Sequence, residues 1–159
     1  MMAQLPDPEE ITWAVIEPMY DGLLTPYEPD PRLGASTPGQ RALYALHWTR
    51  SEVGNGGFDQ YLYNPTGMLA DEAVAGAQLL DLGVLAGVIR RSLEIFPEGR
   101  LIEDNDARRE YMGGKDFTAT LSALDDEFYD CVGFEWPSHL AVRCAGYIQS
   151  NPQEFFVDA

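Results

Sequence analysis

Apolar side chains recur at helical spacing between Phe117 and Cys131. At 100° per residue they fall inside a sector of about 80°. The residues of this sector are Phe117, Leu121, Leu124, Phe128 and Cys131. The acidic residues on the opposite side of the same helical wheel are Asp116, Asp126, Glu127 and Asp130. One face suits burial and the other suits solvent, so the pattern predicts an amphipathic helix over about 117–131.

Similar patterns predict further helices before and after this segment. Ser36-Thr37-Pro38 is a capping residue followed by proline, a signal for a helix start, and this helix is expected to run to Val53. Other helices are predicted at about 58–62, 70–82 and 84–96, with Gly83 between the last two, and from Pro137 to about residue 151. No segment shows sustained alternation of apolar and polar residues. We therefore expect an all-α fold, a compact and irregular single-domain bundle of about seven to eight short helices.

The N-terminal part has a different composition from the rest. Residues 7–31 carry seven acidic side chains, five prolines and no cation. A short helix is predicted through Ile11, Trp13, Val15 and Ile16. Because proline fixes φ and lacks a backbone donor, the following proline-rich part is expected to be an extended connector. We predict an acidic helix and proline-rich arm over 1–35, packed on a helical domain over 36–159.

The charge of the chain excludes several classes of partner. Asp and Glu number 26 against 10 Lys and Arg, which gives a formal net charge of −16. Phosphate groups are bound by clustered cations, so neither direct nucleic-acid binding nor binding to an anionic membrane is expected. The least polar stretch, Leu82–Ile89, is far shorter than the ~20 residues of a membrane span. The first cation is Arg32, so the start of the chain lacks the basic region of a signal peptide, and we expect a cytoplasmic protein.

The sequence contains few residues suited to catalysis or metal binding. Cys131 and Cys144 form no Cys-x-x-Cys motif, and two reduced thiols are favoured over a disulfide. Cys131 and His139 can be read as a nucleophile and its base, but Cys131 lies on the apolar stripe, which favours a buried structural thiol. His47 and His139 belong to no recognised metal-ligand pattern. We expect no catalytic residue.

Two further motifs share only part of the pattern of a ligand site. The acidic run at 103–106 lacks the ligand spacing and central glycine of a calcium loop. The glycine-rich run at 54–57 lacks the Lys-Ser/Thr ending of a phosphate-binding loop, and Glu52 and Asp59 beside it would repel phosphate. We therefore expect a structural turn at 54–57, and neither a metal nor a cofactor.

The most distinctive segment is 51–67, which reads SEVGNGGFDQYLYNPTG. It resembles the signature of the DNA mimic protein 19-like family of bacteria, an acidic residue and Val followed by x-Asn-Gly-Gly-Phe-x-Gln-aromatic and closing on Asn-x-x-Gly. The matching positions are Asn55, Gly56, Gly57, Phe58, Gln60, Asn64 and Gly67. Residues 124–129 and 147–152 look similar too, so the resemblance covers about 41–156. Leu62 takes the place of a residue that is usually aromatic.

This resemblance implies a compact all-α fold without known enzymatic activity, and it makes a homodimer a candidate state. It also implies a role, because a founding member of the family imitates duplex DNA with surface carboxylates and binds a transcription factor. The signature itself is expected to be architectural. Asn55 and the glycines would set a turn between helices, while Phe58, Tyr61 and Leu62 would pack in the core.

The acidic residues cluster in the way that a binding face for a cationic protein requires. Nine acids and three cations occur between residues 103 and 130. Asp126 and Asp130 are like charges one helical turn apart, an arrangement that costs a few tenths of a kcal/mol. We predict a partner-binding face made of Glu103, Asp104, Asp106, Asp116, Asp126, Glu127 and Asp130, and a basic DNA-binding protein as partner.

Three alternatives remain open at this point. The net charge of −16 exceeds the ~2–8 that suffices for solubility, yet an acidic surface can also arise from high-salt adaptation or from general protection against aggregation. The protein can be an immunity-type inhibitor of a basic nuclease toxin, which would also use an acidic face. It can also be a small hydrolase, which would show a deep pocket with convergent carboxylates of perturbed pKa.

Overall fold

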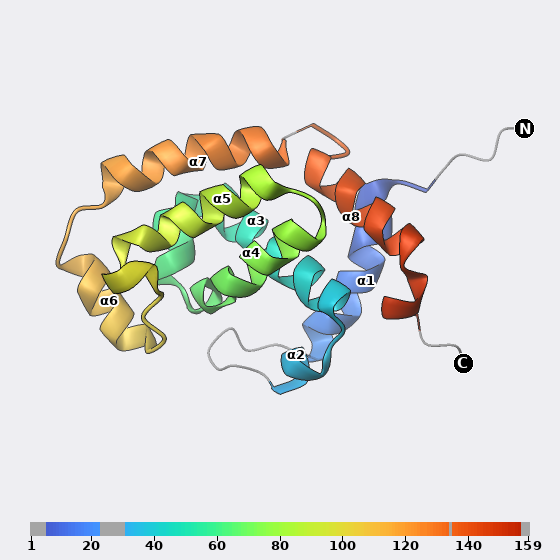
Figure 1. Cartoon of the computed structure of the whole chain (residues 1–159), viewed down its shortest axis with the longest axis horizontal. Coiled ribbons are helices and arrows are strands. Elements are labelled where there is room, and N and C mark those ends of the chain that lie inside the picture. Colours follow the sequence, from blue (N-terminus) through green and yellow to red (C-terminus); the bar gives the residue numbers. More distant parts are fainter. Residues whose placement is uncertain (1–5, 23–30, 134, 157–159) are drawn as a thin grey trace, which may run out of the picture.

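The computed structural model describes residues 6–22, 31–133 and 135–156, which form an irregular helical bundle without a strand (Figure 1). The helices are α1 (Pro8–Gly22), α2 (Pro31–Ala35), α3 (Pro38–Tyr63), α4 (Ala70–Leu79), α5 (Gly83–Ser92), α6 (Asn105–Gly113), α7 (Thr118–Val132) and α8 (His139–Ser150). Short 3₁₀ turns lie at η1 (Pro65–Leu69), η2 (Leu93–Ile95), η3 (Pro97–Gly99) and η4 (Pro152–Glu154). The predicted all-α class is confirmed.

The long helix α3 is the centre of the bundle. It packs against α1, α4, α6, α7 and α8, with α7 along one edge, α6 at one end and α1 beside α8 at the other (Figure 1). Phe58, Tyr61 and Leu62 of α3 are fully buried, as predicted. The Phe58 and Phe128 rings meet edge to face at 5.5 Å, which joins α3 to α7. Burying side chains of this size contributes about 1.5–3 kcal/mol each.

The start of α3 follows the predicted capping signal. The Thr37 hydroxyl accepts a hydrogen bond from the backbone N–H of Gln40 at 3.1 Å. The Gln40 side-chain oxygen accepts one from the Thr37 N–H at 3.0 Å. This reciprocal pair is a capping box, and Pro38 occupies the first helical turn, where its missing N–H costs nothing.

The N-terminal part departs from the prediction at two places. Helix α1 runs through Pro18 to Gly22, so residues 17–22 are helical rather than extended. Proline at position 18 removes the hydrogen bond to the carbonyl of Ala14, but Ala14 and Pro18 are both exposed, and water can satisfy that carbonyl. The second departure is the short helix α2, which begins at Pro31. The rest of the predicted connector, 23–30, lies outside the described residues.

Two element boundaries in the middle of the chain also differ from the prediction. The turn between α4 and α5 consists of residues 80–82, with Asp81 at φ 58°, and Gly83 is the first residue of α5 rather than the linker. Helix α6 was not predicted. Its N-cap is Asp104, whose carboxylate accepts a hydrogen bond from the N–H of Ala107 at 2.8 Å. An acidic residue that caps a helix cannot be distinguished in the sequence from an acidic residue of an ordinary surface. The start of α6 was therefore not recognised within the acidic run.

Candidate partner-binding surface

The signature segment breaks α3 at two glycines. Gly56 and Gly57 have non-helical backbone angles, and Gly57 adopts φ 73° and ψ −178°, which glycine alone adopts readily. The chain resumes as a helix at Phe58, whose N–H donates to the Asp125 carboxylate of α7 at 2.7 Å. A Cβ on Gly57 would lie 2.4 Å from the other oxygen of this carboxylate. The predicted turn is confirmed, and it is built around an acid from α7.

The polar residues of the signature bond to one another. The Glu52 carboxylate accepts hydrogen bonds from the Gln60 and Asn64 side chains at 2.8 and 2.9 Å. Asn55 donates to the Gln60 side-chain oxygen at 3.2 Å. Gly67 closes the segment where a Cβ would come within 2.8 Å of the Tyr61 carbonyl oxygen. These contacts hold the two parts of α3 and the turn η1 together, in agreement with an architectural role.

A buried arginine, which the sequence reasoning did not single out, completes this architecture. Arg108 of α6 is fully buried. Its guanidinium donates to the carbonyls of Leu62 and Asn64 at 2.7 and 3.0 Å, and to that of Ile102 at 2.7 Å. This cation therefore fastens α6 to the end of α3 and offers no charge to the surface.

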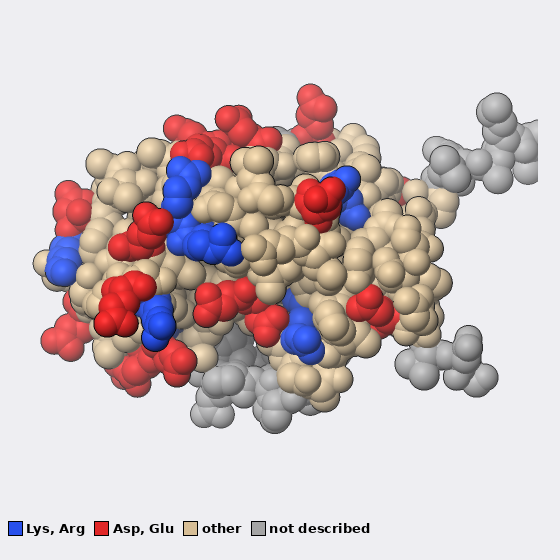
Figure 2. All heavy atoms as spheres, in the orientation of Figure 1, with Lys and Arg blue, Asp and Glu red and all other residues tan. Residues whose placement is uncertain are grey.

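The seven predicted binding residues are all exposed but lie in separate groups. Glu103, Asp104 and Asp106 surround the start of α6, and Asp116 follows in the connection to α7. Asp126, Glu127 and Asp130 lie in the second half of α7. Figure 2 shows acidic side chains along the edge formed by α7 and around the end formed by α6, with basic side chains between them. The structure does not bring the seven carboxylates into one cluster.

Several of these carboxylates have partners within the chain. Glu127 is bridged by both terminal nitrogens of Arg91, one of them at 3.1 Å from Oε1, and this pairing lowers the pKa of Glu127. Asp104 caps α6. Asp116 accepts a hydrogen bond from the Thr118 N–H at 3.0 Å, which lowers its pKa. Among the described residues, Asp126 and Asp130 make no hydrogen bond or ion pair, so their charge is uncompensated.

Asp59 and Asp125 extend the α7 group, and the sequence reasoning missed both. Burial raises the pKa of Asp125, the hydrogen bond from Phe58 opposes this, and the neighbouring charges of Asp126 and Asp59 raise it further. The contact has a geometric basis, because Asp59 directly follows Phe58, whose N–H binds Asp125, and Asp126 directly follows Asp125. We call Asp59, Asp125, Asp126 and Asp130 the α7 acidic group. Asp59 is exposed and lies 66 residues before Asp125 in the sequence, so only the fold brings it to α7.

Comparison with known proteins places this architecture in a family. The sequence model of the family described as DMP19-like protein matches residues 35–151. The chain belongs to the DMP19-like family. No curated protein and no solved structure matches it. The match contains the whole signature and all seven predicted binding residues, whereas α1, at Pro8–Gly22, precedes it.

Cys131 and His139, the residues that could act as a nucleophile and its base, meet through the backbone in this DMP19-like chain. The His139 ring nitrogen Nδ1 lies 3.2 Å from the Cys131 carbonyl oxygen, so the ring contacts the backbone of Cys131. Cys131 and Cys144 are free thiols; Cys144 is buried as predicted, whereas Cys131 is only partly buried. Burial raises the pKa of Cys144 to about 12. Within 6–22, 31–133 and 135–156, no group of three or more acids, histidines or cysteines is arranged to hold a metal ion, and no helix is long and apolar enough to cross a membrane.

Proposed function

We propose that this DMP19-like protein is a non-enzymatic interaction protein whose α7 acidic group binds a basic DNA-binding protein, such as a transcriptional regulator, in place of DNA. The observation that carries the proposal is that Asp126 and Asp130, exposed and four residues apart on α7, have no hydrogen bond or ion pair among the described residues. Like charges held this close repel one another. A cationic partner would relieve that repulsion.

The distribution of negative charge supports partner binding at one local site rather than over the whole surface. The accessible surface of 9108 Å² divided by the 16 net charges leaves about 570 Å² for each, which is too dilute to imitate a row of phosphates. Asp126 and Asp130 are four residues apart on one helix, a rise of about 6 Å. The phosphates of one DNA strand follow at about 3.4 Å along the axis. Two further carboxylates beside this pair raise the local charge toward that of DNA.

One positive charge at this surface is already engaged. Arg91 of α5, a helix that packs against α7, is paired with Glu127. It cannot neutralise the α7 acidic group without breaking that pair. The group around the start of α6 lies at another end of the molecule (Figure 1), and we propose it as a secondary contact for a partner that extends beyond α7.

The hydrolase alternative has less support. It requires a carboxylic acid in a pocket that remains protonated near neutral pH. Glu9 lines a hollow beside α1, but its carboxylate favours the ionised form. Burial by itself raises the pKa of Glu9, but hydrogen bonds from Ser138 and Arg50 outweigh burial and leave the pKa lowered. The Glu9 carboxylate is thus ionised and fully engaged by the protein.

Capture of partners, followed by measurements with purified components, tests this proposal. The tagged protein would be incubated with lysate at low and high salt and with duplex DNA as competitor, and the captured protein would then be purified. Its affinity would be measured for the wild type, for D126N/D130N, and for E94Q/D71N. The last variant removes the same charge from exposed positions outside α7.

We expect a basic DNA-binding protein that is released by salt and displaced by DNA. D126N/D130N should weaken its binding about tenfold, because each exposed charge contact contributes up to about 1 kcal/mol, and E94Q/D71N should change it less than twofold. A basic nuclease, inhibited by the protein, would favour the immunity alternative. Equal loss in both variants, a partner that resists salt and DNA, or no partner at all would overturn the proposal. Sedimentation of the free protein tests the candidate homodimer, which would double the number of acidic groups.

A further inference from the structure

A hollow of about 300 Å³ lies between α1, α3 and α8, away from the α7 acidic group. Its base is apolar and includes Ile16, Leu46 and Leu140. One side is formed by residues of α1, which precede the part of the chain that matches the DMP19-like family. The family assignment therefore supplies no role for this hollow.

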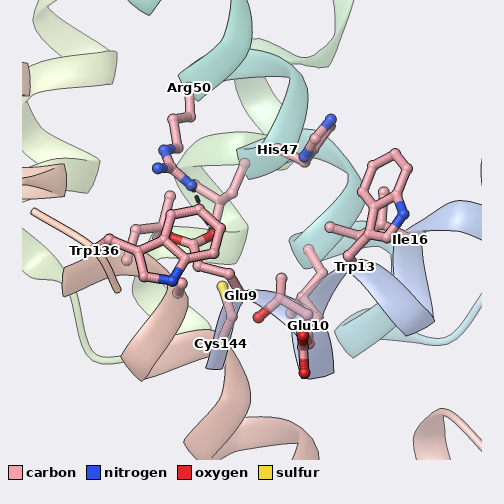
Figure 3. A pocket seen from close by; sticks show the side chains of 13 residues that line it. Glu9, Glu10, Trp13, Ile16, His47, Arg50, Trp136 and Cys144 are labelled. Carbon is pink, nitrogen blue, oxygen red and sulfur yellow. Dashed lines mark hydrogen bonds and ion pairs between the residues drawn. The ribbon is translucent and has the colours of Figure 1, made fainter. Parts of the chain in front are cut away.

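Two tryptophans stand on opposite sides of the hollow (Figure 3). Trp136 is 71% exposed, and its indole N–H donates to the Asp7 carboxylate at 2.7 Å, which fixes the ring. Trp13 is 43% exposed and packs against the ring of His47, with ring centres 5.6 Å apart. Large aromatic surfaces left in contact with water at the mouth of a hollow are typical of a binding site.

The charged residues of the hollow leave an excess of negative charge. Arg50 donates to the Glu9 carboxylate at 3.1 Å, so these two charges offset each other. The remaining Glu9 oxygen is taken by the Ser138 backbone and hydroxyl at 2.9 and 2.7 Å. Glu10 also lines the hollow, is exposed, and has no ion-pair partner in the described parts of the chain.

His47 adds no positive charge at neutral pH. Burial, together with the nearby charge of Arg50, lowers its pKa to about 4, so its ring is neutral. An anionic ligand would have to displace Glu9 from Arg50 in a chain of net charge −16. An uncharged ligand would bury the Glu10 carboxylate without a counter-ion, which is costly. A cationic ligand would not have to displace Glu9 from Arg50, and it would supply the Glu10 carboxylate with a counter-ion.

We propose that this hollow binds a compact organic cation, an ammonium or guanidinium group on a short alkyl chain, between the Trp13 and Trp136 rings with Glu10 as its counter-ion. Aromatic faces attract such cations through their negative electrostatic potential. The alkyl part would lie on the apolar base. The cation can be a free amine or the side chain of a basic protein, and the site is independent of the α7 acidic group.

Titration with choline, followed by the tryptophan indole N–H signals in NMR at constant ionic strength, tests this site. The uncharged isostere 3,3-dimethylbutan-1-ol is the matched ligand. We expect choline to shift the Trp13 and Trp136 signals more than that of Trp48, which does not line the hollow. Choline should bind at least about tenfold more tightly than the isostere, because the isostere lacks the cation.

Glu10→Gln should weaken choline binding about fivefold or more, since it removes the counter-ion. Glu17→Gln removes the same charge from an exposed position of α1 outside the hollow, and it should change binding less than twofold. Trp136→Leu should weaken binding similarly to Glu10→Gln. Circular dichroism of each variant checks its folding.

Further ligands identify the source of the cation. Acetylated lysine and arginine amides represent a protein side chain, and spermidine represents a free amine; tighter binding of either class supports the site and assigns its source. Equal binding of choline and its isostere, equal loss in Glu10→Gln and Glu17→Gln, or no shift up to about 50 mM choline would overturn the proposal. D126N/D130N should bind choline like the wild type, so failure here is distinguishable from failure of the proposed function.

Discussion

Replacing Gly57 with alanine tests how the signature segment holds the fold together. At φ 73° and ψ −178° this backbone lies in a region that residues with a Cβ rarely adopt. The new methyl group would also lie 2.4 Å from an oxygen of Asp125. Asp125 would have to turn away, and its hydrogen bond from the Phe58 N–H, now 2.7 Å, would lengthen or break.

The expected cost follows from these two effects. Forcing alanine into this backbone region costs about 1–3 kcal/mol. Loss of a hydrogen bond to a carboxylate adds about 1.5–3 kcal/mol, and the lower end applies because Asp125 is only partly buried. Together they predict that G57A lowers the free energy of unfolding by about 2.5–4.5 kcal/mol. Against a total of about 5–15 kcal/mol, this is a large fraction.

Urea unfolding followed by far-UV circular dichroism measures this difference. Gly54→Ala is the matched control, because Gly54 is a helical and exposed residue of the same helix with no atom within 4 Å of an added Cβ. Alanine should stabilise the helix there by up to about 1 kcal/mol. In a D125A background the clash disappears, so the additional cost of G57A should fall to the backbone strain alone.

Three outcomes would refute this reasoning. The first is a G57A variant within about 0.5 kcal/mol of the wild type, since that is the usual effect of a neutral surface substitution. The second is an equal loss in G54A, which would indicate a general intolerance of alanine in this segment. The third is full additivity of G57A and D125A, which would mean that the two residues do not act on each other.

Other variants test separate parts of the structure. Arg108→Met should lower the free energy of unfolding by about 3 kcal/mol or more, because it leaves buried carbonyls without donors; Arg109→Met, at a less buried position, should lower it far less. His47 loses its proton at about 4 in the fold and at 6.5 in its ordinary state, so its contribution to stability is complete above pH 6.5 and is lost as pH falls toward 4. His47→Gln should therefore remove up to about 3 kcal/mol of acid sensitivity in that window, as measured by unfolding at each pH. Cys144, with its pKa raised to about 12 and its side chain buried, should react with a thiol reagent at pH 8 only after unfolding; rapid native labelling of a Cys131→Ser variant would contradict this.

Local signals in the sequence predicted much of the fold. The capping signal at Ser36-Thr37-Pro38, the break at Gly57 and the buried stripe of α7 each depend on residues within a few positions of one another. The period of α7 likewise put Asp126 and Asp130 together on its exposed side. Where a local signal is ambiguous the prediction fails, as at Asp104, which caps a helix that the sequence pattern does not predict.

The candidate site was harder to predict than the helices, because it depends on contacts between residues that are far apart in the sequence. Asp125 lies 67 residues from Phe58, and no local pattern distinguishes it from Asp126 beside it. Arg108 and Arg109 are adjacent residues of the same type, yet Arg108 is buried and Arg109 is not. The acids of α6 and those of α7 are separated because of the path that the chain takes around α3. The helical periodicity of the sequence does not predict that path.

The contact between Asp125 and Phe58 links the signature to the proposed binding surface. Through it the glycine turn of α3 sets the position of α7, and α7 carries Asp126 and Asp130. The signature can therefore be required for partner binding without touching the partner. A variant of the turn should reduce binding and stability together, whereas D126N/D130N should reduce binding alone, because these two exposed side chains make no hydrogen bond or ion pair among the described residues. Comparing the two classes of variant separates the architecture that presents the charge from the charge itself.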